Sequence, residues 1–463
     1  MLFSSFEFLY LFLPLTVLVY FCIPDGGKNH VLLAASLVFY GIASPKLLPL
    51  LLIVSLADWL FGLFIEAQIL KSRQRWANAT VVCAVIFNVG ILVFFKYLDP
   101  FLSVIGVSPL GIELPVGISF YIFQAMSYVF DVKRRAVAAQ KNGFTFLTYV
   151  SLFPQLVAGP IVRYSDVERE LTGRRHTLTV AADGLALFSL GLAKKVLLAN
   201  GAGLIWERSV LLSRGENTVL CAWLGIIGFA FQIYFDFSGY SDMARGLGRL
   251  FGFEFPENFR YPYISRSITE FWRRWHITLS SWFREYVYIP LGGNRRSTAR
   301  TYLNLLAVWS LTGIWHGASL NFLFWGLYFF AVLFLEKLFI LKILKKMPSF
   351  AGHIYSLFLI LIGWLIFASD GLSHPLSYFL CLFGVGCPLF NNDAIYEFSR
   401  NLPFLLIMAV GCTPLPTRIF EKLRNKSERW SIAVRNVLAV LSFLLCTCYL
   451  ADSGYNPFLY FRF

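Results

Sequence analysis

The sequence predicts an all-α polytopic membrane protein, and three observations support this fold class. Of the 463 residues, 57% are hydrophobic and only 14% are charged, which leaves too few polar side chains to cover a soluble domain. The hydrophobic residues form runs that approach the roughly 20 residues a helix needs to cross a bilayer. Basic residues are concentrated between these runs, where they act as topology signals. The formal charge of +14 is therefore no indication of nucleic-acid binding.

Residues 1–143 are predicted to form the N-terminal spans. Apolar runs begin at five positions: Phe8, Val31, Leu47, Thr80 and Val116. The segments around Lys28, 71–75 and 133–135 carry basic residues, whereas 100–115 carries no Lys or Arg, and Lys46 is a lone exception to the alternation. Because cytoplasmic loops are enriched in Lys and Arg, we expect the N-terminus outside and the basic loops in the cytoplasm. The first run has no basic n-region or cleavage site, so it is predicted to be a retained span.

Residues 144–345 are predicted to form a core with interrupted helices. The stretch 144–162 is broken by two prolines and a glycine, and the stretch 271–291 mixes aromatic with charged residues. Such backbone is tolerated at membrane depth where it is buried in protein or lines an aqueous cavity, so we expect re-entrant or interfacial helices around a catalytic funnel or tunnel. Residues 346–463 are predicted to be C-terminal spans. The whole chain, 1–463, is then one integral-membrane domain with about 11 to 13 membrane-inserted segments.

His316 is the main candidate for chemistry. Between Arg300 and Glu336 it is the only side chain that titrates near neutral pH, and an ionisable group held in an apolar membrane segment is costly and usually functional. An imidazole can accept the proton of a hydroxyl as that hydroxyl attacks a thioester. We therefore predict that His316 is the general base of an acyl transfer, with Trp315 and Trp325 excluding water. A satisfied core histidine that joins two helices is the structural alternative.

His276 is a second candidate, in the stretch FWRRWHITLSSWFREYVYIPLGGNR. It could orient a substrate or tune His316, or it could simply cap an aromatic belt at the membrane interface. The neighbouring Arg273 and Arg274 could bind the phosphates of an anionic donor such as coenzyme A. The alternative is that these arginines are positive-inside signals.

Other polar residues complete the candidate site. Asp236 and Asp242 stand near the end of an apolar run, and we expect them to pair with arginines of the block that follows. Ser238 and Asn304 are further candidates for lining the tunnel or binding the donor. The eight cysteines show no CxxC spacing and no Cys/His cluster, which predicts packing residues and no metal site.

Two stretches carry a specific family resemblance. They are QIYFDFSGYSDMARGLGRLFGFEFPENFRYPYISRSITEFWRRWHITLSSWFREYVYIPLGGNR and WHGASLNFLFWG. They resemble the membrane-bound O-acyltransferase (MBOAT) superfamily and, within it, the bacterial branch of the alginate O-acetylation protein AlgI. The likeness begins at the N-terminal LFSSFEFLYLFLP and continues through SLFPQLVAGPIVR.

The resemblance implies a helical fold in the bacterial inner membrane with a funnel on the cytoplasmic side. It implies that His316 is catalytic and that His276 is the second histidine of the site. The donor would be cytosolic acetyl-CoA, used as a substrate without any permanently bound cofactor. The acceptor would be an extracytoplasmic polysaccharide such as alginate, cellulose or peptidoglycan, reached directly or through an SGNH-hydrolase-like acetyltransferase partner.

Three other functions remain open. A related branch, DltB, transfers D-alanyl groups to teichoic acid, but it tends to lack the PLGG stretch that is present here in YVYIPLGGNR. A transporter of polysaccharide or acyl donor would share the broken helices, although the chain shows no inverted repeat and few acidic residues that could couple ions. If the protein is a scaffold for polysaccharide export, replacing His316 should have no effect on any transfer reaction.

Overall fold

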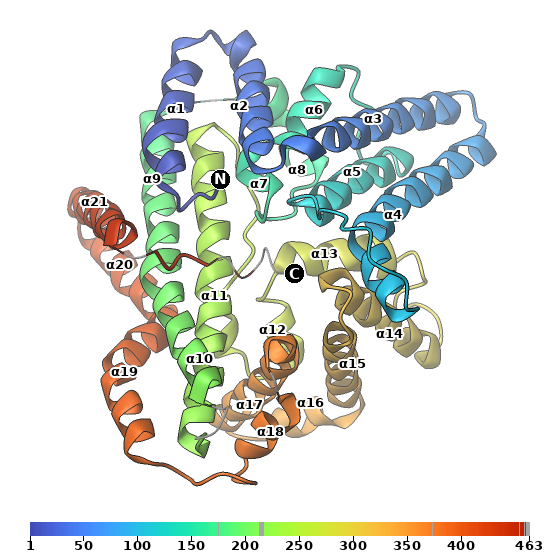
Figure 1. Cartoon of the computed structure of the whole chain (residues 1–463). Helices are drawn as coiled ribbons and strands as arrows, with labels where there is room; N and C mark the ends of the chain where they lie inside the picture. The colour runs from blue at the N-terminus through green and yellow to red at the C-terminus, as the bar shows by residue number, and fades with distance from the viewer. Residues whose placement is uncertain (175, 213–216, 373, 453, 458, 460–463) are drawn as a thin grey trace. The chain divides into compact units, whose positions relative to one another are not determined.

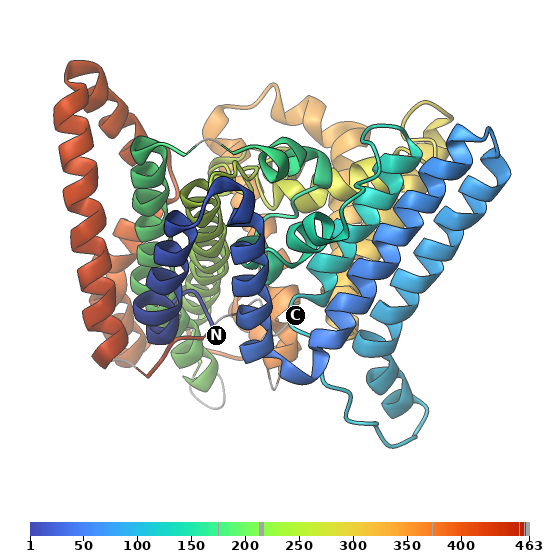
Figure 2. The ribbon, with the colours of Figure 1, turned by 90° about the horizontal axis from the view of Figure 1, so that it is seen from above.

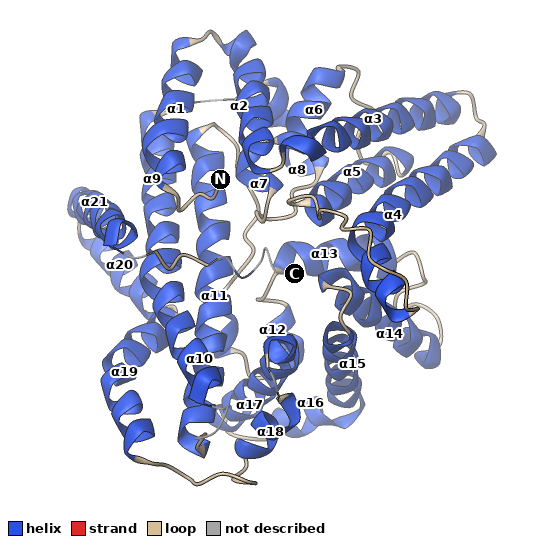
Figure 3. Cartoon of the chain, in the orientation of Figure 1, coloured by secondary structure: helices blue, strands red, loops and turns tan. Residues whose placement is uncertain are grey.

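Helices make up the regular structure of the chain. The computed structural model describes residues 1–174, 176–212, 217–372, 374–452, 454–457 and 459. In this part of the chain the secondary structure is helical and no strand occurs (Figure 3). The predicted all-α class is thereby confirmed.

The chain divides into two compact units. Unit 1 comprises Met1–Phe188 and Tyr240–Glu257, and unit 2 comprises Ser189–Gly239 and Asn258–Phe463. The helices α9 (Leu178–Ala193) and α11 (Val219–Leu250) each contribute residues to both units.

Unit 1 is built from short and long helices of the N-terminal part. Its complete helices are α1 (Leu13–Cys22), α2 (Lys28–Ala43), α3 (Leu48–Leu70), α4 (Gln74–Val104), α5 (Ile118–Lys133), α6 (Gly143–Ser151), α7 (Phe153–Leu156) and α8 (Tyr164–Thr172). In Figures 1 and 2, α3, α4 and α5 lie side by side. Close packing explains part of this arrangement, because a Cβ atom at Gly62 of α3 would lie 2.4 Å from the Tyr128 ring of α5.

The predicted interruption within 144–162 is confirmed in unit 1. Helix α6 ends at Ser151, Leu152 leaves the helical conformation, and α7 is only four residues long. Gly159 makes the next tight turn, since a Cβ atom there would lie 2.7 Å from the Cα of Gln155. The backbone here is buried against protein, as expected for non-helical backbone in a membrane protein.

Unit 2 contains the remaining helices. After the end of α9 they are α10 (Asn200–Leu212), α11, α12 (Ile268–Trp272), α13 (Ile277–Phe283), α14 (Thr298–His316), α15 (Leu320–Leu335), α16 (Leu341–Leu344), α17 (Ser349–Ala368), α18 (Pro375–Cys381), α19 (Asn392–Gly411), α20 (Leu415–Lys426) and α21 (Glu428–Asp452). Helix α15 packs between α14 and α17. The core that these helices share is rich in Trp and Phe side chains.

Several helices are long and apolar enough to cross a membrane, so the protein is a multi-pass membrane protein. In the described part of the chain they are Pro45–Leu70, Gln74–Val104, Val219–Leu250, Ser349–Ala368 and Glu428–Asp452, with α19 and α20 forming one further pair bent by 59°. The sequence estimate of 11 to 13 inserted segments is larger because it also counted apolar helices shorter than 18 residues. Helices α1 and α15, with 10 and 16 residues, are examples.

Helix α11 is longer than the sequence suggested. In the sequence the apolar run ends near Asp236, but the helix continues to Leu250. A Cβ atom at Gly239 would lie 2.7 Å from the carbonyl oxygen of Gly191 on α9. This glycine therefore lets the two backbones approach, as small residues do at helix interfaces in membranes, and does not break the helix.

Two cysteines are not simple packing residues. Cys381 and Cys387 form a disulfide, with Cα atoms 5.7 Å apart. The turn between them contains Gly384 and Gly386, both at positive φ, a conformation that glycine adopts without steric cost. The expectation that all eight cysteines only fill space is wrong for this pair, because a spacing of six residues gives no sequence signal of pairing.

Candidate active site

His316 is the last residue of α14, and the local sequence explains why the helix stops there. Gly317 follows in an extended conformation, and Ser319 precedes the first residue of α15. The two helices form a close hairpin. A Cβ atom at Gly313 would lie 2.4 Å from the Phe322 carbonyl oxygen, and one at Gly326 would lie 2.3 Å from the Trp309 carbonyl oxygen. Glycine at both positions thus fixes the turn that carries His316.

The imidazole of His316 lies among aromatic rings. Its side chain is buried, and its ring centroid is 4.9 Å from Trp315, 5.0 Å from Trp325 and 5.3 Å from Phe367. Phe367 belongs to α17, so three helices contribute to this environment. Such surroundings exclude water from any reaction at the imidazole.

His276 lies in the turn between α12 and α13. It has φ 44° and ψ 54°, a left-handed conformation that costs a non-glycine residue on the order of 1–3 kcal/mol. Its Nδ1 is 3.1 Å from Oδ1 of Asn258, and its ring centroid is 4.7 Å from Phe237 and 6.3 Å from Trp315. Burial lowers the pKa of His276 below its ordinary value, so its imidazole is neutral near pH 7.

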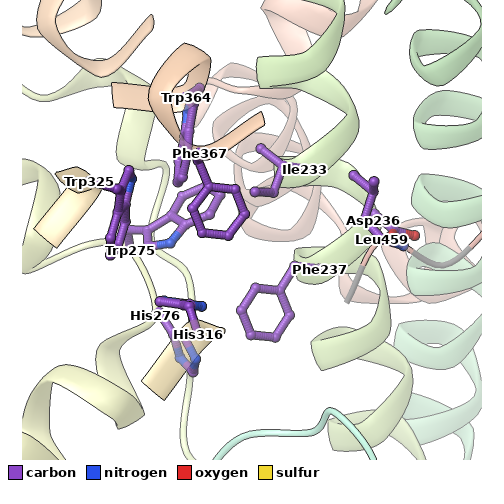
Figure 4. A pocket seen from close by; sticks show the side chains of 10 residues that line it. All are labelled: Ile233, Asp236, Phe237, Trp275, His276, His316, Trp325, Trp364, Phe367 and Leu459. Carbon is purple, nitrogen blue, oxygen red and sulfur yellow. Dashed lines mark hydrogen bonds between the residues drawn. The ribbon is translucent and has the colours of Figure 1, made fainter. Parts of the chain in front are cut away.

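The two histidines line one cavity within unit 2. Its lining side chains are Ile233, Asp236, Phe237, Trp275, His276, His316, Trp325, Trp364, Phe367 and Leu459. In Figure 4 the two imidazoles are drawn together, and Asp236 and Leu459 lie on the other side of the cavity. The cavity volume is about 20 Å³, and roughly 10–15 Å³ is enough for one water molecule. The cavity is therefore narrow and lined mostly by aromatic side chains.

The segment that carries His276 is held in place by a buried carboxylate. Glu336, directly after α15, is fully buried, and its two oxygens accept hydrogen bonds from the backbone N–H groups of Ile268 (2.7 Å) and Thr269 (2.8 Å). These groups belong to the first turn of α12, where a negative charge is favourable. The sequence reasoning did not identify this role of Glu336.

Asp236 lines the cavity, but its partner differs from the expectation. Its carboxylate forms an ion pair of 2.8 Å with Lys195, and both side chains are almost fully buried. Its Oδ2 also accepts a hydrogen bond from the Leu459 backbone N–H (2.9 Å). The predicted pairing of Asp236 with arginines of the following block is therefore wrong. The reason is geometric, since Asp236 lies in the middle of α11 beside the Lys195 segment.

The other carboxylate, Asp242, also pairs outside that block. Its partner is Arg245, one turn later on α11, at 3.5 Å. Arg274 of the block pairs with Glu270 at 2.8 Å and also donates a hydrogen bond to the Arg260 carbonyl oxygen. The positive charge of Arg274 is thus neutralised by Glu270 within the arginine-rich block itself.

The remaining candidates fall into two groups. Trp315 contacts both histidine rings, so it belongs to the site although it does not line the cavity. Ser238 is buried on α11 outside the cavity lining. Asn304 is buried and donates hydrogen bonds to the carbonyl oxygens of Leu291 (3.3 Å) and Gly293 (3.0 Å). Asn304 therefore supports the PLGG turn and does not face the histidines.

Arg273 is exposed and has a basic neighbour. Lys337 is also exposed as a residue. Partial burial of its ammonium group and, to a smaller extent, the nearby charge of Arg273 lower the pKa of Lys337. Two cations held near each other favour an anionic ligand. No group of three or more His, Cys, Asp or Glu side chains in the described residues is arranged to hold a metal ion.

Comparison with known proteins gives the family. A sequence profile of the membrane-bound O-acyltransferase family (MBOAT) matches residues 67–368. A probable alginate O-acetylase, AlgI, of Azotobacter vinelandii is 40% identical over 83% of this chain and 79% of its own length. Its counterpart in Pseudomonas putida is 35% identical over the full length of both chains. A peptidoglycan O-acetyltransferase of Helicobacter pylori is 32% identical over 100% of this chain and 98% of its own.

Two of these relatives match the whole chain. The matched profile includes both histidines and every other residue that lines the cavity except Leu459. The resemblance predicted from the two sequence stretches is confirmed. The chain is an acyltransferase that belongs to the membrane-bound O-acyltransferase family.

Proposed function

We propose that the protein is a membrane O-acetyltransferase that uses cytosolic acetyl-CoA to acetylate an extracytoplasmic polysaccharide. The observation that carries this proposal is the narrow aromatic cavity shared by His276 and His316. The similar proteins named alginate O-acetylase and peptidoglycan O-acetyltransferase support an O-acetyl product. The acceptor is then a polymer of the alginate, cellulose or peptidoglycan type.

The proposed reaction assigns a role to His316. The hydroxyl oxygen of the acceptor attacks the thioester carbonyl, a C–O bond forms and the C–S bond breaks. His316 accepts the hydroxyl proton and returns it to the departing thiolate, so the step is balanced. A base of this kind accelerates acyl transfer by about 100- to 10,000-fold, and the surrounding Trp315, Trp325 and Phe367 rings protect the thioester from hydrolysis.

The size of the cavity supports acetyl as the transferred group. A volume of about 20 Å³ corresponds to one or two water molecules, so it favours a small acyl group and leaves no room for a fatty acyl chain. D-alanyl transfer is the second candidate, but a D-alanyl group is larger and carries an ammonium. The PLGG turn, supported by Asn304 through its bonds to Leu291 and Gly293, also favours the acetyl branch.

Acetyl-CoA carries several phosphates, and the protein offers cations for them. We assign the donor phosphates to Arg273 and Lys337, which are exposed neighbours in unit 2. Arg274 contributes less because Glu270 already neutralises it. A guanidinium is well suited to bind phosphate through two hydrogen bonds.

The proposed orientation places the N-terminus outside and the protein in the bacterial inner membrane. Lys342, Lys345 and Lys346 precede α17, and α20 carries Arg418, Lys422, Arg424 and Lys426, whereas residues 369–391 contain no Lys or Arg. By the positive-inside rule, the segment 369–391 is extracytoplasmic. The Cys381–Cys387 disulfide in this segment agrees with that side, because disulfides persist in oxidising compartments.

The final acceptor step is proposed to involve a partner protein. Unit 1 and unit 2 are both helical in their described residues, and neither offers a separate domain that could hold a long polysaccharide. We propose that an extracytoplasmic acetyltransferase of the SGNH-hydrolase type receives the acetyl group and passes it to the polymer. The division of the chain into N-terminal spans (1–143), a histidine-bearing core (144–345) and C-terminal spans (346–463) is likewise a proposal.

The test compares the ester-linked acetyl content of secreted polysaccharide and peptidoglycan between cells with the wild-type protein and cells with His316→Ala at matched protein level. We expect one polymer to lose its acetyl esters. Unchanged acetyl in every polymer, with lost D-alanyl esters on teichoic acid, would replace acetyl by D-alanyl transfer. No change in any ester would show that the transfer does not depend on His316.

A further inference from the structure

One asparagine side chain organises the turn that carries His276. Asn258 is 1% exposed and His276 is 2% exposed. The Asn258 Oδ1 lies 3.1 Å from Nδ1 of His276, 3.2 Å from the backbone N of Thr278 and 3.0 Å from its Oγ1. Three groups from the same turn thus converge on a single amide oxygen.

The backbone of the same residue clamps this turn. The carbonyl oxygen of Asn258 accepts a hydrogen bond from the Ile277 N–H (3.0 Å), and the Arg260 N–H donates to the Arg274 carbonyl oxygen (2.9 Å). The segment 258–260 therefore runs alongside 274–278 and is joined to it on both sides of His276. His276 is held in its left-handed conformation (φ 44°) by these contacts.

The contacts determine which ring nitrogen carries the proton. A backbone N–H can only donate, so the Asn258 atom that faces Thr278 must be the carbonyl oxygen and not the amide nitrogen. An amide oxygen can only accept, so Nδ1 of His276 must be the donor in its bond to that oxygen. In the neutral imidazole, the proton is then on Nδ1 and the acceptor lone pair is on Nε2.

We propose that Asn258 is a positioning residue that fixes His276 as the Nδ1–H tautomer, so that Nε2 is the nitrogen that accepts a proton or a hydrogen bond during acyl transfer. This inference rests on the proposed function, because it gives His276 a part in the reaction at the cavity it shares with His316. Asn258 itself does not line that cavity and acts through His276.

The charges near His276 decide how it responds to a change at Asn258. From α11 the cavity is faced by Asp236, which is already paired with Lys195, and from α14 by His316. Arg274, two residues earlier, is paired with Glu270. The cavity lining in the described part of the chain contains one carboxylate, Asp236, which Lys195 already neutralises. A carboxylate introduced at position 258 would therefore add a negative charge next to Nδ1 of His276.

The test uses Asn258→Asp and Asn258→Leu in the full-length protein, with acetyl transfer from acetyl-CoA measured across pH. Asp keeps an acceptor oxygen for Nδ1 but adds a negative charge, which stabilises the imidazolium and raises the pKa of His276. As the pH falls, His276 then becomes protonated at a higher pH than in the wild type. We expect Asn258→Asp to retain transfer within about tenfold at high pH and to move the acidic limb of the pH profile upward. Leu removes the acceptor, and we expect kcat to fall at least tenfold with an unchanged KM for acetyl-CoA.

Asn391→Asp is the matched control. Asn391 caps α19 by accepting a hydrogen bond from the Ala394 N–H (2.8 Å), and Asp caps a helix equally well, so its pH profile should match the wild type. An Asn258→Asp profile that also matches the wild type would overturn the proposal, as would an Asn258→Leu protein with full kcat. Absence of acetyl transfer in the wild type would instead refute the proposed function, which keeps the two failures distinct.

Discussion

His276 and His316 face one cavity, although His276 lies in the turn before α13 and His316 ends α14. The Trp315 ring lies 6.3 Å from the His276 ring and 4.9 Å from the His316 ring, so the three side chains form one group. A different structural feature positions each histidine. A glycine-packed hairpin carries His316, and a turn clamped by Asn258 carries His276.

The width of the cavity predicts selectivity for short acyl groups. One extra methylene in a pocket that is already filled changes kcat/KM by about 10- to 200-fold, so acetyl-CoA should be preferred over propionyl-CoA by at least tenfold. Phe367→Ala removes a ring from the cavity lining, so it should lower the ratio of kcat/KM for acetyl-CoA to kcat/KM for propionyl-CoA. The measurement is the ratio of kcat/KM for the two donors. Phe358→Ala, an exposed position on the same helix α17, is the control that should keep the wild-type ratio, and an unchanged ratio in Phe367→Ala would contradict the size argument.

The Lys195–Asp236 pair predicts a marked asymmetry between single and double variants. Removing one partner of a buried ion pair leaves an uncompensated charge and costs about 3–5 kcal/mol, whereas replacing both by apolar residues is often neutral. We expect Lys195→Met and Asp236→Leu each to lower the thermal stability of the purified protein, and the double variant to recover most of it. Unfolding monitored by tryptophan fluorescence measures this. Additive losses in the double variant would show that the two side chains act independently.

The hairpin of α14 and α15 predicts that its glycines cannot be enlarged. A Cβ atom at Gly313 would lie 2.4 Å from a backbone oxygen of α15, so Gly313→Ala must separate the helices and should cost about 1–3 kcal/mol. Because His316 ends the same helix, acyl transfer should also fall. Gly90→Ala on α4 is the control, since nothing lies within 4 Å of its Cβ position, and alanine favours a helix. Equal stability of the two variants would contradict the packing argument.

The proposed orientation predicts the sidedness of two cysteine sites. In intact cells a membrane-impermeant maleimide should label the partly exposed Cys387 from outside, and only after its disulfide with the buried Cys381 is reduced. Cys22, an exposed cysteine at the end of α1 next to the Lys28 loop, should be labelled only after the membrane is opened. Mass spectrometry of the labelled peptides reads out both sites. Labelling of Cys22 in intact cells would reverse the assigned topology.

The sequence predicted the class of fold correctly, and it singled out the two histidines that line one cavity in the structure. Both results have physical reasons. A long run without any charge makes His316 conspicuous, and a proline- and glycine-broken stretch marks the interruption after Ser151. The continuation of α11 to Leu250 was missed because the polar residues after Phe235 resemble a helix end. Their burial against other helices is a tertiary effect that periodicity does not reveal.

The ion-pair and hydrogen-bond partners of the site residues could not be predicted from the sequence. Asp236 was assigned to arginines that follow it, whereas its ion-pair partner, Lys195, precedes it on another helix. Asn258 and Glu336 carry no motif that marks them, yet they fix the turn and the helix around His276. Long-range contacts of single polar side chains depend on how the helices pack, which one sequence does not specify.

Whether His316 is the base of an acetyl transfer can be measured with purified protein in proteoliposomes. Turnover of acetyl-CoA with an acceptor hydroxyl compound is measured for the wild type, His316→Ala and His30→Ala, an exposed histidine in the first turn of α2. If His316 is that base, His316→Ala should fold normally and lose at least 100-fold in kcat, while His30→Ala should match the wild type. If His316→Ala folds normally and keeps more than about a tenth of the wild-type rate, His316 is not that base.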